Sequence, residues 1–466
     1  MCAENAVPMR QNESTAELLY DRKGNRMQKD LTKGNITKTL LAFAVPMILG
    51  NMLQQLYNIA DTLIVGRFLG ADALAAVGTA YSLMTFLTSI FIGLCMGSGS
   101  VFSICFGERD EKKLKERIFV SFLCIAAVAV CIEIVVTAAV DPILSLLQVP
   151  AELRGMMKEY LMVIFSGIIF TFLYNYFAFL LRAVGNSVTP LIFLAVSAIL
   201  NIGLDLLLVV IFSRGVAGAA EATVISQAIS GIGLAVYTLL REPSLRVGRE
   251  QMRFSRVGVL EIAKYSVLTC IQQSVMNFGI LMVQGLVNSF GTTVMAAFAA
   301  AVKIDTFAYM PAQEFGNAFS LFTAQNYGAR QNERIRRGVR SAVRTAVIFC
   351  LVISAAVFAG AELLMKIFID AGETGVIAAG AQYLRIEGAF YCGIGILFLM
   401  YGYFRAVNRP LMSVILTVIS LGTRVGLAYL LAAIPAIGVL GIWWSIPIGW
   451  FLADLAGAIA YRRSCR

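Results

Sequence analysis

The sequence predicts an all-α polytopic membrane protein with twelve transmembrane helices, built as two homologous six-helix bundles. Three observations lead to this prediction. The 466-residue chain is 59% hydrophobic and only 14% charged, a composition that no soluble globular domain is expected to have. Apolar segments long enough to cross a bilayer recur along nearly the whole chain. The second half of the chain also repeats features of the first half at a constant spacing.

The twelve expected spans follow one another with short loops between them. They are expected at residues 37–64, 72–106, 117–147, 157–182, 188–213 and 216–240, and then at 258–288, 292–326, 339–369, 378–404, 410–433 and 437–461. Some of them exceed the minimum length that a bilayer requires, which permits the helices to tilt.

The repeat is clearest around the second span of each half. Gly70 opens that span in the first half and Gly291 opens it in the second, so their numbers differ by 221 (291 − 70). Gly107 and Gly328 close the same two spans before a basic loop, and their offset is again 221 (328 − 107). Because six helices preserve the direction of the chain, the halves are expected to be related by an axis along the membrane normal. Transporters with such repeats bind substrate near the middle of the membrane and work by alternating access.

Basic residues in the loops predict the orientation of the chain. They are concentrated in the N-terminal tail, in the loops at 109–117 and 330–344, in the linker and at the C-terminus. By the positive-inside rule both termini are cytoplasmic, in agreement with an even number of spans. The expected organisation is a cytoplasmic tail (1–35), an N-lobe with the first six spans (36–240), a cytoplasmic linker (241–257), a C-lobe with the last six (258–461) and a cytoplasmic C-terminus (462–466). The tail lacks the apolar core of a cleavable signal peptide.

Several function classes are disfavoured by what the sequence lacks. It has no histidine, which removes the commonest general base and metal ligand. Most of its nine cysteines lie within apolar runs without CxxC spacing, so we interpret them as small buried hydrophobic residues. It has no nucleotide-binding fingerprint and no nucleophile–base constellation. We therefore expect no enzyme activity, no cofactor, no resident metal and no nucleic-acid partner, since the net charge of +10 lies in the loops.

A polar stripe in the first span is the leading candidate site. Gln54, Asn58 and Asp61 follow one another at i, i+4 and i+7, so a helix places them near one face. A carboxyl group inside the bilayer is costly, at roughly 2.5–3.5 kcal/mol for a central Asp, and usually marks a site. We interpret Asp61 as a protonatable or cation-binding group that drives transport. The alternative is a carboxylate at the outer end of the helix, near Arg67.

A second polar group is expected on the fifth and sixth spans. Asn201 and Asp205 are four residues apart on one helix face, and Thr223 lies in the small-residue start of the sixth span. Two acids in one six-helix bundle suggest a shared polar cavity, where desolvation and mutual repulsion would favour a proton on one carboxyl. The oxygens of Asp61, Asn201, Asp205 and Thr223 could coordinate Na⁺ instead, and the sequence does not separate the two ions. A structural capping role for Asn201 and Asp205 is the alternative.

The acids are placed differently in the second half. The seventh span carries Gln272 and Gln273 but no acid near its middle, and the eighth span carries Asp305 and Glu314. We regard these four residues as a possible C-lobe cavity. Asp305 could be balanced locally by Lys303, whereas Glu314 could be a second substrate or ion group.

These segments together resemble the multidrug and toxic compound extrusion (MATE) transporters of prokaryotes. The resemblance covers residues 36–461 and is carried by VPMILGNMLQQLYNIADTLIVGRFLGADALAAVG at 45–78, FGERD at 106–110, LRAVGNS at 181–187, LNIGLD at 200–205, GVAGAAEAT at 215–223 and AQNYGA at 324–329. It implies export of organic cations and drugs in exchange for H⁺ or Na⁺.

The resemblance also implies roles for particular residues. In the DinF-like branch of the family, an Asp of the first helix lies in a polar network of the N-lobe, and its pattern Tyr-Asn-x-x-Asp matches Tyr57, Asn58 and Asp61. The other matches to this branch, on the fourth, fifth and sixth helices, are Asn175, Asn201, Asp205 and Thr223. The NorM-like branch uses acids on the seventh and tenth helices, and we expect no mid-span acid on either helix here. The resemblance therefore favours ion coupling in the N-lobe.

The leading hypothesis is a secondary antiporter that exports cationic or amphipathic organic molecules across the bacterial plasma membrane in exchange for H⁺ or Na⁺. We expect a monomer whose partners are small organic substrates and the lipid bilayer. Two alternatives stay open: a flippase for lipid-linked precursors from the same superfamily, and a non-transporting membrane receptor or scaffold. Such flippases often have more spans and a basic central cavity, whereas the charges within these spans are mostly acidic. The buried acids and the repeat disfavour a receptor.

Overall fold

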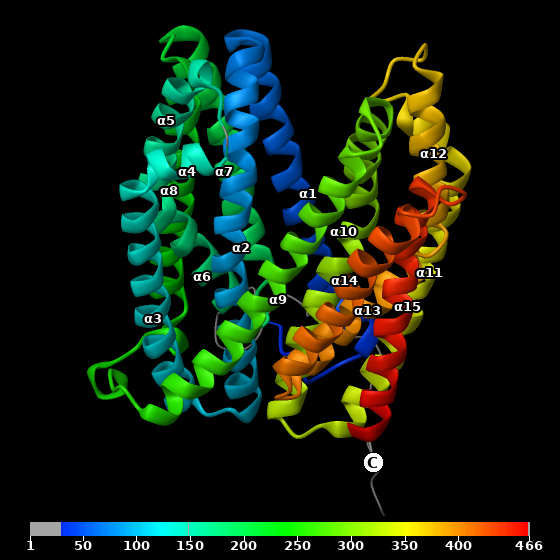
Figure 1. The fold of residues 1–466 in the computed structure, drawn as a ribbon. Helices are drawn as coiled ribbons and strands as arrows, with labels where there is room; N and C mark the ends of the chain where they lie inside the picture. Colours follow the sequence, from blue (N-terminus) through cyan, green and yellow to red (C-terminus); the bar gives the residue numbers. More distant parts are fainter. Residues whose placement is uncertain (1–28, 148, 465–466) are drawn as a thin grey trace, which may run out of the picture.

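The computed structural model describes residues 29–147 and 149–464, and this part of the chain folds into helices without strands. Most of the expected N-terminal tail and the last two residues lie outside the described residues. The helices run in chain order (Figure 1) as α1 (Ile36–Leu69), α2 (Ala71–Glu108), α3 (Glu111–Ala138), α4 (Val140–Leu146), α5 (Ala151–Ser166), α6 (Ile168–Ala183), α7 (Val188–Asp205), the π-helical η2 (Leu206–Ile211), α8 (Gly215–Arg241), the short turns η3 (Pro243–Leu245) and η4 (Arg249–Gln251), α9 (Arg256–Asn288), α10 (Thr292–Gly328), α11 (Asn332–Met365), α12 (Thr374–Gly388), α13 (Tyr391–Ala406), α14 (Pro410–Ala432) and α15 (Val439–Ser464).

The fold class is confirmed, because the described part of the chain holds twelve candidate membrane spans. Ten are single helices, and the other two are bent pairs, α5 with α6 at 44° and α12 with α13 at 53°. The sequence predicted these two spans, 157–182 and 378–404, as continuous helices. The first one breaks at Gly167, where a Cβ atom would lie 2.7 Å from Cγ2 of Val224 on α8. The predicted third span, 117–147, also differs, since α3 ends at Ala138 and the separate helix α4 follows.

The backbone repeats together with the sequence. Gly70 and Gly291 have φ angles of 89° and 93°, and Arg109 and Arg330 have φ angles of 58° and 56°. Both pairs are separated by the same offset that relates the two halves in the sequence, and the second pair places a non-glycine residue in the left-handed region twice. The two bent spans are also the fourth span of each half. The halves therefore share their local geometry as well as their sequence pattern.

The two lobes exchange the beginnings of their first helices. Phe43 and Met47 of α1 belong to the hydrophobic core of the C-lobe, whereas Val65 of the same helix belongs to the core of the N-lobe. The first helix of the second half, α9, does the reverse: its Tyr265 lies in the N-lobe core and its Val283 in the C-lobe core. Each of these long helices thus crosses from one lobe to the other.

The lobes touch most closely at the end where Lys29 and Ser464 lie, which we call the terminal end. There α2 crosses α10 with direct backbone contact. A Cβ atom on Gly107 would lie 2.0 Å from the carbonyl oxygen of Gln325, and one on Gly328 would lie 2.0 Å from that of Ile104. From this crossing the lobes diverge toward the opposite end (Figure 1).

A strap formed by residues 29–34 lies across the same crossing. The amide of Lys29 donates to the carbonyl of Gly185 in the N-lobe (3.2 Å), and the amide of Leu31 donates to Oε1 of Gln325 in the C-lobe (3.1 Å). Arg334 of α11 donates to the carbonyl oxygens of Leu31 (3.2 Å) and Gly34 (2.8 Å). The strap therefore joins both lobes at the terminal end.

One acid of the strap is held in its charged form. Partial burial alone would raise the pKa of Asp30, but hydrogen bonds from Thr32 and the charge of Lys33 outweigh it and lower the pKa. Its carboxylate accepts from the Thr32 amide at 2.9 Å. Because the pKa of Asp30 is lower in the folded protein, its carboxylate stabilises the fold at pH values above the ordinary pKa of an Asp. This contribution is lost as the pH falls through the lowered pKa.

The helix crossing makes a testable prediction. We expect Gly107→Ala and Gly328→Ala each to lower the melting temperature in detergent, because the new methyl group must push the two backbones apart, and overpacking of this kind typically costs about 1–3 kcal/mol. Gly155→Ala on α5 is the matched control, since nothing lies within 4 Å of its Cβ position. Equal melting temperatures for all three variants would contradict the close contact.

Candidate functional site

A pair of carboxyl groups lies between the first and fifth spans. Asp61 of α1 and Asp205 at the end of α7 lie within hydrogen-bonding reach of each other. Asp205 is completely buried, and no N–H or O–H group of the described residues donates to either of its oxygens. Neither acid has a cationic partner in this part of the chain, and Arg67 in particular forms no ion pair with Asp61. The structure thus brings together the two N-lobe acids that the sequence singled out.

An amide and a hydroxyl lie one turn from the pair. Asn201 Nδ2 donates to Thr223 Oγ1 at 3.3 Å, and Thr223 Oγ1 donates to the carbonyl of Ala219 at 3.1 Å. Oδ1 of Asn201 is buried and has no hydrogen-bond partner among the described residues. Asn201, Asp205 and Thr223 therefore form one polar group on α7 and α8. Its oxygens are chemically suitable for holding a proton or for coordinating a small cation.

The helix that carries Asp205 changes its hydrogen-bonding pattern at that residue. Immediately after it, Leu206–Ile211 form the π-helical turn η2, and the amide of Phe212 donates to the carbonyl of Leu207 at 2.9 Å. π-Helical turns are rare and often occur at functional sites, because the extra residue per turn stays in place only when the surroundings favour it. Asp205 therefore lies at the junction between an α-helical and a π-helical segment.

Two tyrosines accompany the acids, and sequence reasoning found only one of them. Tyr57 lies near Asp61 and within hydrogen-bonding reach of Gln54. Tyr160 of α5 is 7% exposed and lies within electrostatic range of Asp61, Asp205 and Tyr57. No pattern in the sequence points to Tyr160, because its helix approaches the acids only in the folded molecule.

Two other predicted residues point away from the acid pair. Asn58 donates to Tyr81 Oη of α2 at 3.4 Å, so the stripe on α1 is split between two neighbouring helices. Asn175 donates to the carbonyl of Thr171 on its own helix at 2.8 Å. No hydrogen bond joins either Asn58 or Asn175 to the acids within the described residues. Asn58 and Asp61 differ in direction because residues three apart on a helix are rotated by about 60° from each other, whereas Asn175 lies on a different helix, α6.

A second buried polar cluster occupies the C-lobe. Asp305 of α10 faces the side chain of Tyr391, Glu387 of α12 faces that of Tyr383, and Arg424 of α14 lies within electrostatic range of both acids. Asp305 and Glu387 are 4% and 2% exposed, so both are desolvated beside the same guanidinium group. The expectation that the tenth span lacks a mid-span acid is wrong, because Glu387 lies there and is buried.

Lys303 does not balance Asp305. No ion pair joins the two within the described residues, and the positive charge near Asp305 comes from Arg424. Two positions apart on a helix, side chains point in nearly opposite directions, so the proposed local pair was geometrically unfavourable.

Glu314 belongs to a different group, nine residues further along α10. It accepts from Nδ2 of Asn51 on α1 (3.0 Å) and from Nδ2 of Asn317 (3.2 Å). Asn317 Oδ1 in turn accepts from Arg405 of α13 at 3.2 Å. An amide thus separates the buried carboxylate from the buried guanidinium, and Asn51 ties the group to α1.

The two glutamines of α9 do not join either C-lobe group. Gln272 is buried with an unpartnered Oε1, and Gln273 is half-buried. No hydrogen bond connects them to Asp305 or Glu314 within the described residues. The four residues expected to form one C-lobe cavity are therefore distributed over three places.

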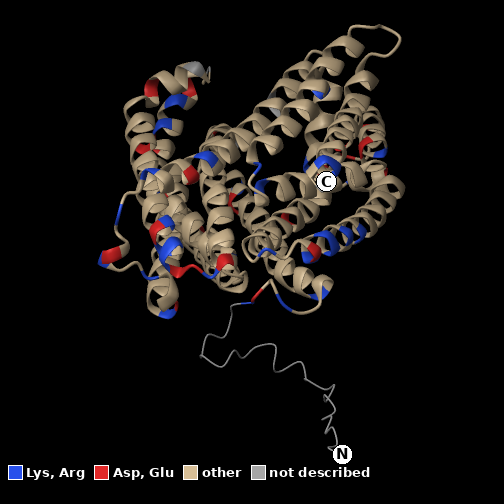
Figure 2. Cartoon of the chain, turned by 90° about the horizontal axis from the view of Figure 1, so that it is seen from below, with Lys and Arg blue, Asp and Glu red and all other residues tan. Residues whose placement is uncertain are grey.

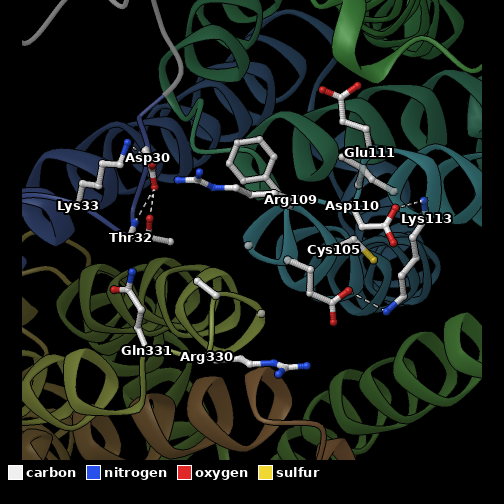
Figure 3. Close-up of a pocket in the computed structure, with 16 residues that line it drawn as sticks. Asp30, Thr32, Lys33, Cys105, Arg109, Asp110, Glu111, Lys113, Arg330 and Gln331 are labelled. Carbon is white, nitrogen blue, oxygen red and sulfur yellow. Dashed lines mark hydrogen bonds and ion pairs between the residues drawn. The ribbon is translucent and has the colours of Figure 1, made fainter.

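A cavity of about 1110 Å³ lies at the terminal end, away from the acid pair (Figure 3). The strap, the α2–α3 loop and the α10–α11 loop line it. Its acids are engaged locally: Lys33 lies 3.5 Å from Asp30, and Lys113 lies 2.9 Å from Glu108. It is a mixed-charge pocket over the helix crossing.

Comparisons with known proteins agree with this architecture. The family model MatE matches residues 46–207 and 266–430. YpnP of Bacillus subtilis, a probable multidrug resistance protein, is 29% identical over 435 residues, which cover 93% of this chain and 96% of YpnP. YoeA of the same organism, also a probable multidrug resistance protein, is 26% identical over 432 residues, covering 91% of this chain and 93% of YoeA.

Solved structures show the same fold. A MOP superfamily transporter from Pyrococcus furiosus, whose binding pocket is described as having reverse polarity, has a TM-score of 0.88 at 24% identity, covering 93% of this chain and 97% of that one. An outward-facing multidrug resistance MATE family transporter gives the same values. Because the family model matches most of both halves of the chain, this protein belongs to the MATE family of multidrug efflux transporters and is not an enzyme.

Proposed function

We propose that this chain is a secondary antiporter that exports organic cations and drugs across the bacterial plasma membrane in exchange for protons. The observation that carries the proposal is the approach of the carboxyl groups of Asp61 and Asp205 to within hydrogen-bonding reach. An ionised carboxylate only accepts hydrogen bonds, so a bond between two carboxyl groups requires a proton on one of them. The pair is therefore suited to take up a proton and release it. Na⁺ is the competing coupling ion, since it could occupy the same oxygens.

The terminal end faces the cytoplasm in this proposal. Seen from that end, many of the ribbon segments coloured for Lys and Arg lie in the loops and helix ends (Figure 2). They include Arg109 and Lys113 beside the α2–α3 loop and Arg330 before α11, and the positive-inside rule assigns such loops to the cytoplasm. Because the lobes touch at this end and diverge at the other, the conformation would be open to the outside.

Helix α1 is the element that would transmit the proton's effect. Asp61 lies in the half of α1 that packs in the N-lobe, whereas Phe43 and Met47 anchor its other half in the C-lobe. Loss of the shared proton would leave two carboxylates in contact in a low-dielectric site, and their repulsion would favour a different position of α1 against α7. Binding of a proton or a substrate cation would thus select between two arrangements of the lobes.

The surroundings of the acids suit an organic cation. Tyr57 lies next to Asp61, and Tyr81, which is 49% exposed, lies within electrostatic range of Tyr57. Exposed aromatic rings attract flat cations through cation–π contact, and a carboxylate nearby supplies the opposite charge. A cation and a proton would then compete for the same acids, which is the simplest form of antiport.

A flippase for lipid-linked precursors is the competing function, and the buried arginines of the C-lobe are the observation in its favour. However, Arg405 donates to Asn317 and Ser320 (3.3 Å), and Arg424 lies beside Asp305 and Glu387. Their charges are thus engaged within the lobe and are less available to an anionic substrate.

The first prediction concerns the coupling site. In proteoliposomes, we expect a proton gradient to drive ethidium transport by the wild type, and a Na⁺ gradient to have no effect. Asp61→Asn and Asp205→Asn should each reduce the proton-driven rate to that without a gradient, because the amide cannot exchange a proton. Glu133→Gln is the matched control on α3, an acid that makes no hydrogen bond or ion pair with the described residues, and it should transport at the wild-type rate.

Other outcomes would redirect the assignment. A wild type that responds to Na⁺ alone would overturn proton coupling. Normal pumping by both Asp variants would place the coupling site elsewhere. Absence of dye movement under either gradient would remove the support for drug export, and translocation of labelled lipid-linked precursors would then be measured.

A second prediction concerns the C-lobe cluster, which we expect to stabilise the lobe and not to couple ions. Glu387→Gln should keep its proton-driven ethidium transport, because Arg424 still lies within electrostatic range of Asp305. Arg424→Gln should lower the melting temperature, because it removes the positive charge that lies within electrostatic range of both buried acids. Loss of the response to a proton gradient in well-folded Glu387→Gln would show that both lobes take part in coupling.

A further inference from the structure

One helix of the C-lobe carries an unusual row of arginines. Arg336, Arg340 and Arg344 follow one another at i, i+4 and i+8 in α11, so they lie on one face of the helix, and all three are exposed. We call these three residues the α11 arginine row. They begin at the terminal end and lead into the span.

The i+4 ridge that carries the row continues along α11 as an exposed apolar surface, turning by about 40° at each step. Ile348 and Val352 extend the row by one and two further turns, and they are 65% and 62% exposed. In a membrane-spanning helix, apolar side chains this exposed contact the acyl chains. With a rise of roughly 1.5 Å per residue, Arg344 lies about 6 Å from Ile348 along the axis and Arg336 about 18 Å. The row therefore covers the depth at which lipid headgroups and their phosphates lie.

The two arginines of the row nearest the acyl chains have no protein counter-charge. Arg340 and Arg344 form no hydrogen bond or ion pair with any described residue. The one acid in the first four turns of α11, Glu333, pairs with the neighbouring Arg337. Guanidinium groups of this kind, next to acyl chains, would require an anion from the membrane.

The two inner arginines of the row have no basic counterpart in the other half, whereas Arg336 corresponds to Lys115 of α3 (336 − 221). With the offset between the halves, Arg340 and Arg344 correspond to Phe119 and Leu123 of α3 (340 − 221 and 344 − 221). Both lobes have basic loops at the terminal end, so membrane orientation alone does not require arginines inside the span. This asymmetry indicates a function that belongs to the C-lobe alone.

We propose that the α11 arginine row is a binding site for the phosphate headgroups of anionic phospholipids, such as phosphatidylglycerol or cardiolipin. A guanidinium group binds a phosphate through two parallel hydrogen bonds, and arginine is weakly hydrated compared with lysine, so it suits a partly buried headgroup. Arg340 and Arg344, one turn apart, offer sites for the two phosphates of one cardiolipin. The acyl chains then lie along Ile348 and Val352. The site requires only that α11 spans a membrane, so it does not depend on the coupling ion or the substrate.

The experiment compares melting temperatures of the purified full chain in detergent mixed with phosphatidylcholine, phosphatidylglycerol or cardiolipin. We expect anionic lipid to raise the melting temperature of the wild type above the value in phosphatidylcholine. Arg340→Gln with Arg344→Gln should lose this increase while melting like the wild type in phosphatidylcholine. Inorganic phosphate at the same concentration should have no effect, because it lacks acyl chains.

A double variant in the linker serves as the matched control. Arg249→Gln with Arg253→Gln removes two exposed positive charges from residues outside the membrane spans and should keep the full increase. Arg340→Lys with Arg344→Lys keeps the charge and should retain part of it, which separates lost binding from lost folding. An undiminished increase in the row variant, or an equal loss in the linker variant, would overturn the proposal.

Discussion

The exchange of helix ends between the lobes is the constraint on which the rest of the structure depends. Phe43 and Met47 hold the start of α1 in the C-lobe, and Tyr265 holds the start of α9 in the N-lobe. Each lobe is thus completed by a helix that continues into the other. Close packing resists small distortions, so such an interface is expected to change between discrete arrangements. Any movement of the lobes must be accompanied by a change in α1 or α9.

This constraint gives the position of the acid pair its significance. Asp61 lies on the part of α1 that belongs to the N-lobe, and its partner Asp205 directly precedes the π-helical turn η2. The other half of α1 is fixed in the C-lobe core, and Asn51, between the two halves, bonds to Glu314. A change at the acids would therefore act directly on α1, the helix whose two halves lie in the two lobes. No separate pathway through side chains is needed, because α1 is a single helix from Ile36 to Leu69, in which Pro46 removes one backbone hydrogen bond.

Much of the fold and part of the candidate site could be predicted from the sequence. Hydropathy can be read from each segment by itself, and it predicted the twelve spans. The constant offset compares segments of the two halves, and it predicted the two bundles. Asn201 and Asp205 could be found because a helix puts residues four apart on one face. Tyr160 was missed because its partners lie on other helices, whose packing no single segment encodes. Glu387 is different, since this acid is visible within the predicted span 378–404, and only its partners Tyr383 and Arg424 needed the structure. The break at Gly167 was missed because hydropathy continues across it, while the reason for the bend lies in Val224 of α8.

The two buried acid clusters differ in one respect, and this difference offers an explanation for why the halves would act differently. In the C-lobe, Asp305 and Glu387 both lie within electrostatic range of the fixed positive charge of Arg424. In the N-lobe, Asp61 and Asp205 have no such cation among the described residues, and a hydrogen bond between them needs a mobile proton. In the proposed antiporter, the permanent positive charge of the C-lobe would stabilise one arrangement, whereas the arrangement of the N-lobe acids would depend on the proton that the membrane gradient supplies. The two homologous bundles would then divide the work of the proposed transport cycle, the C-lobe as a fixed support and the N-lobe as the moving, ion-sensitive part.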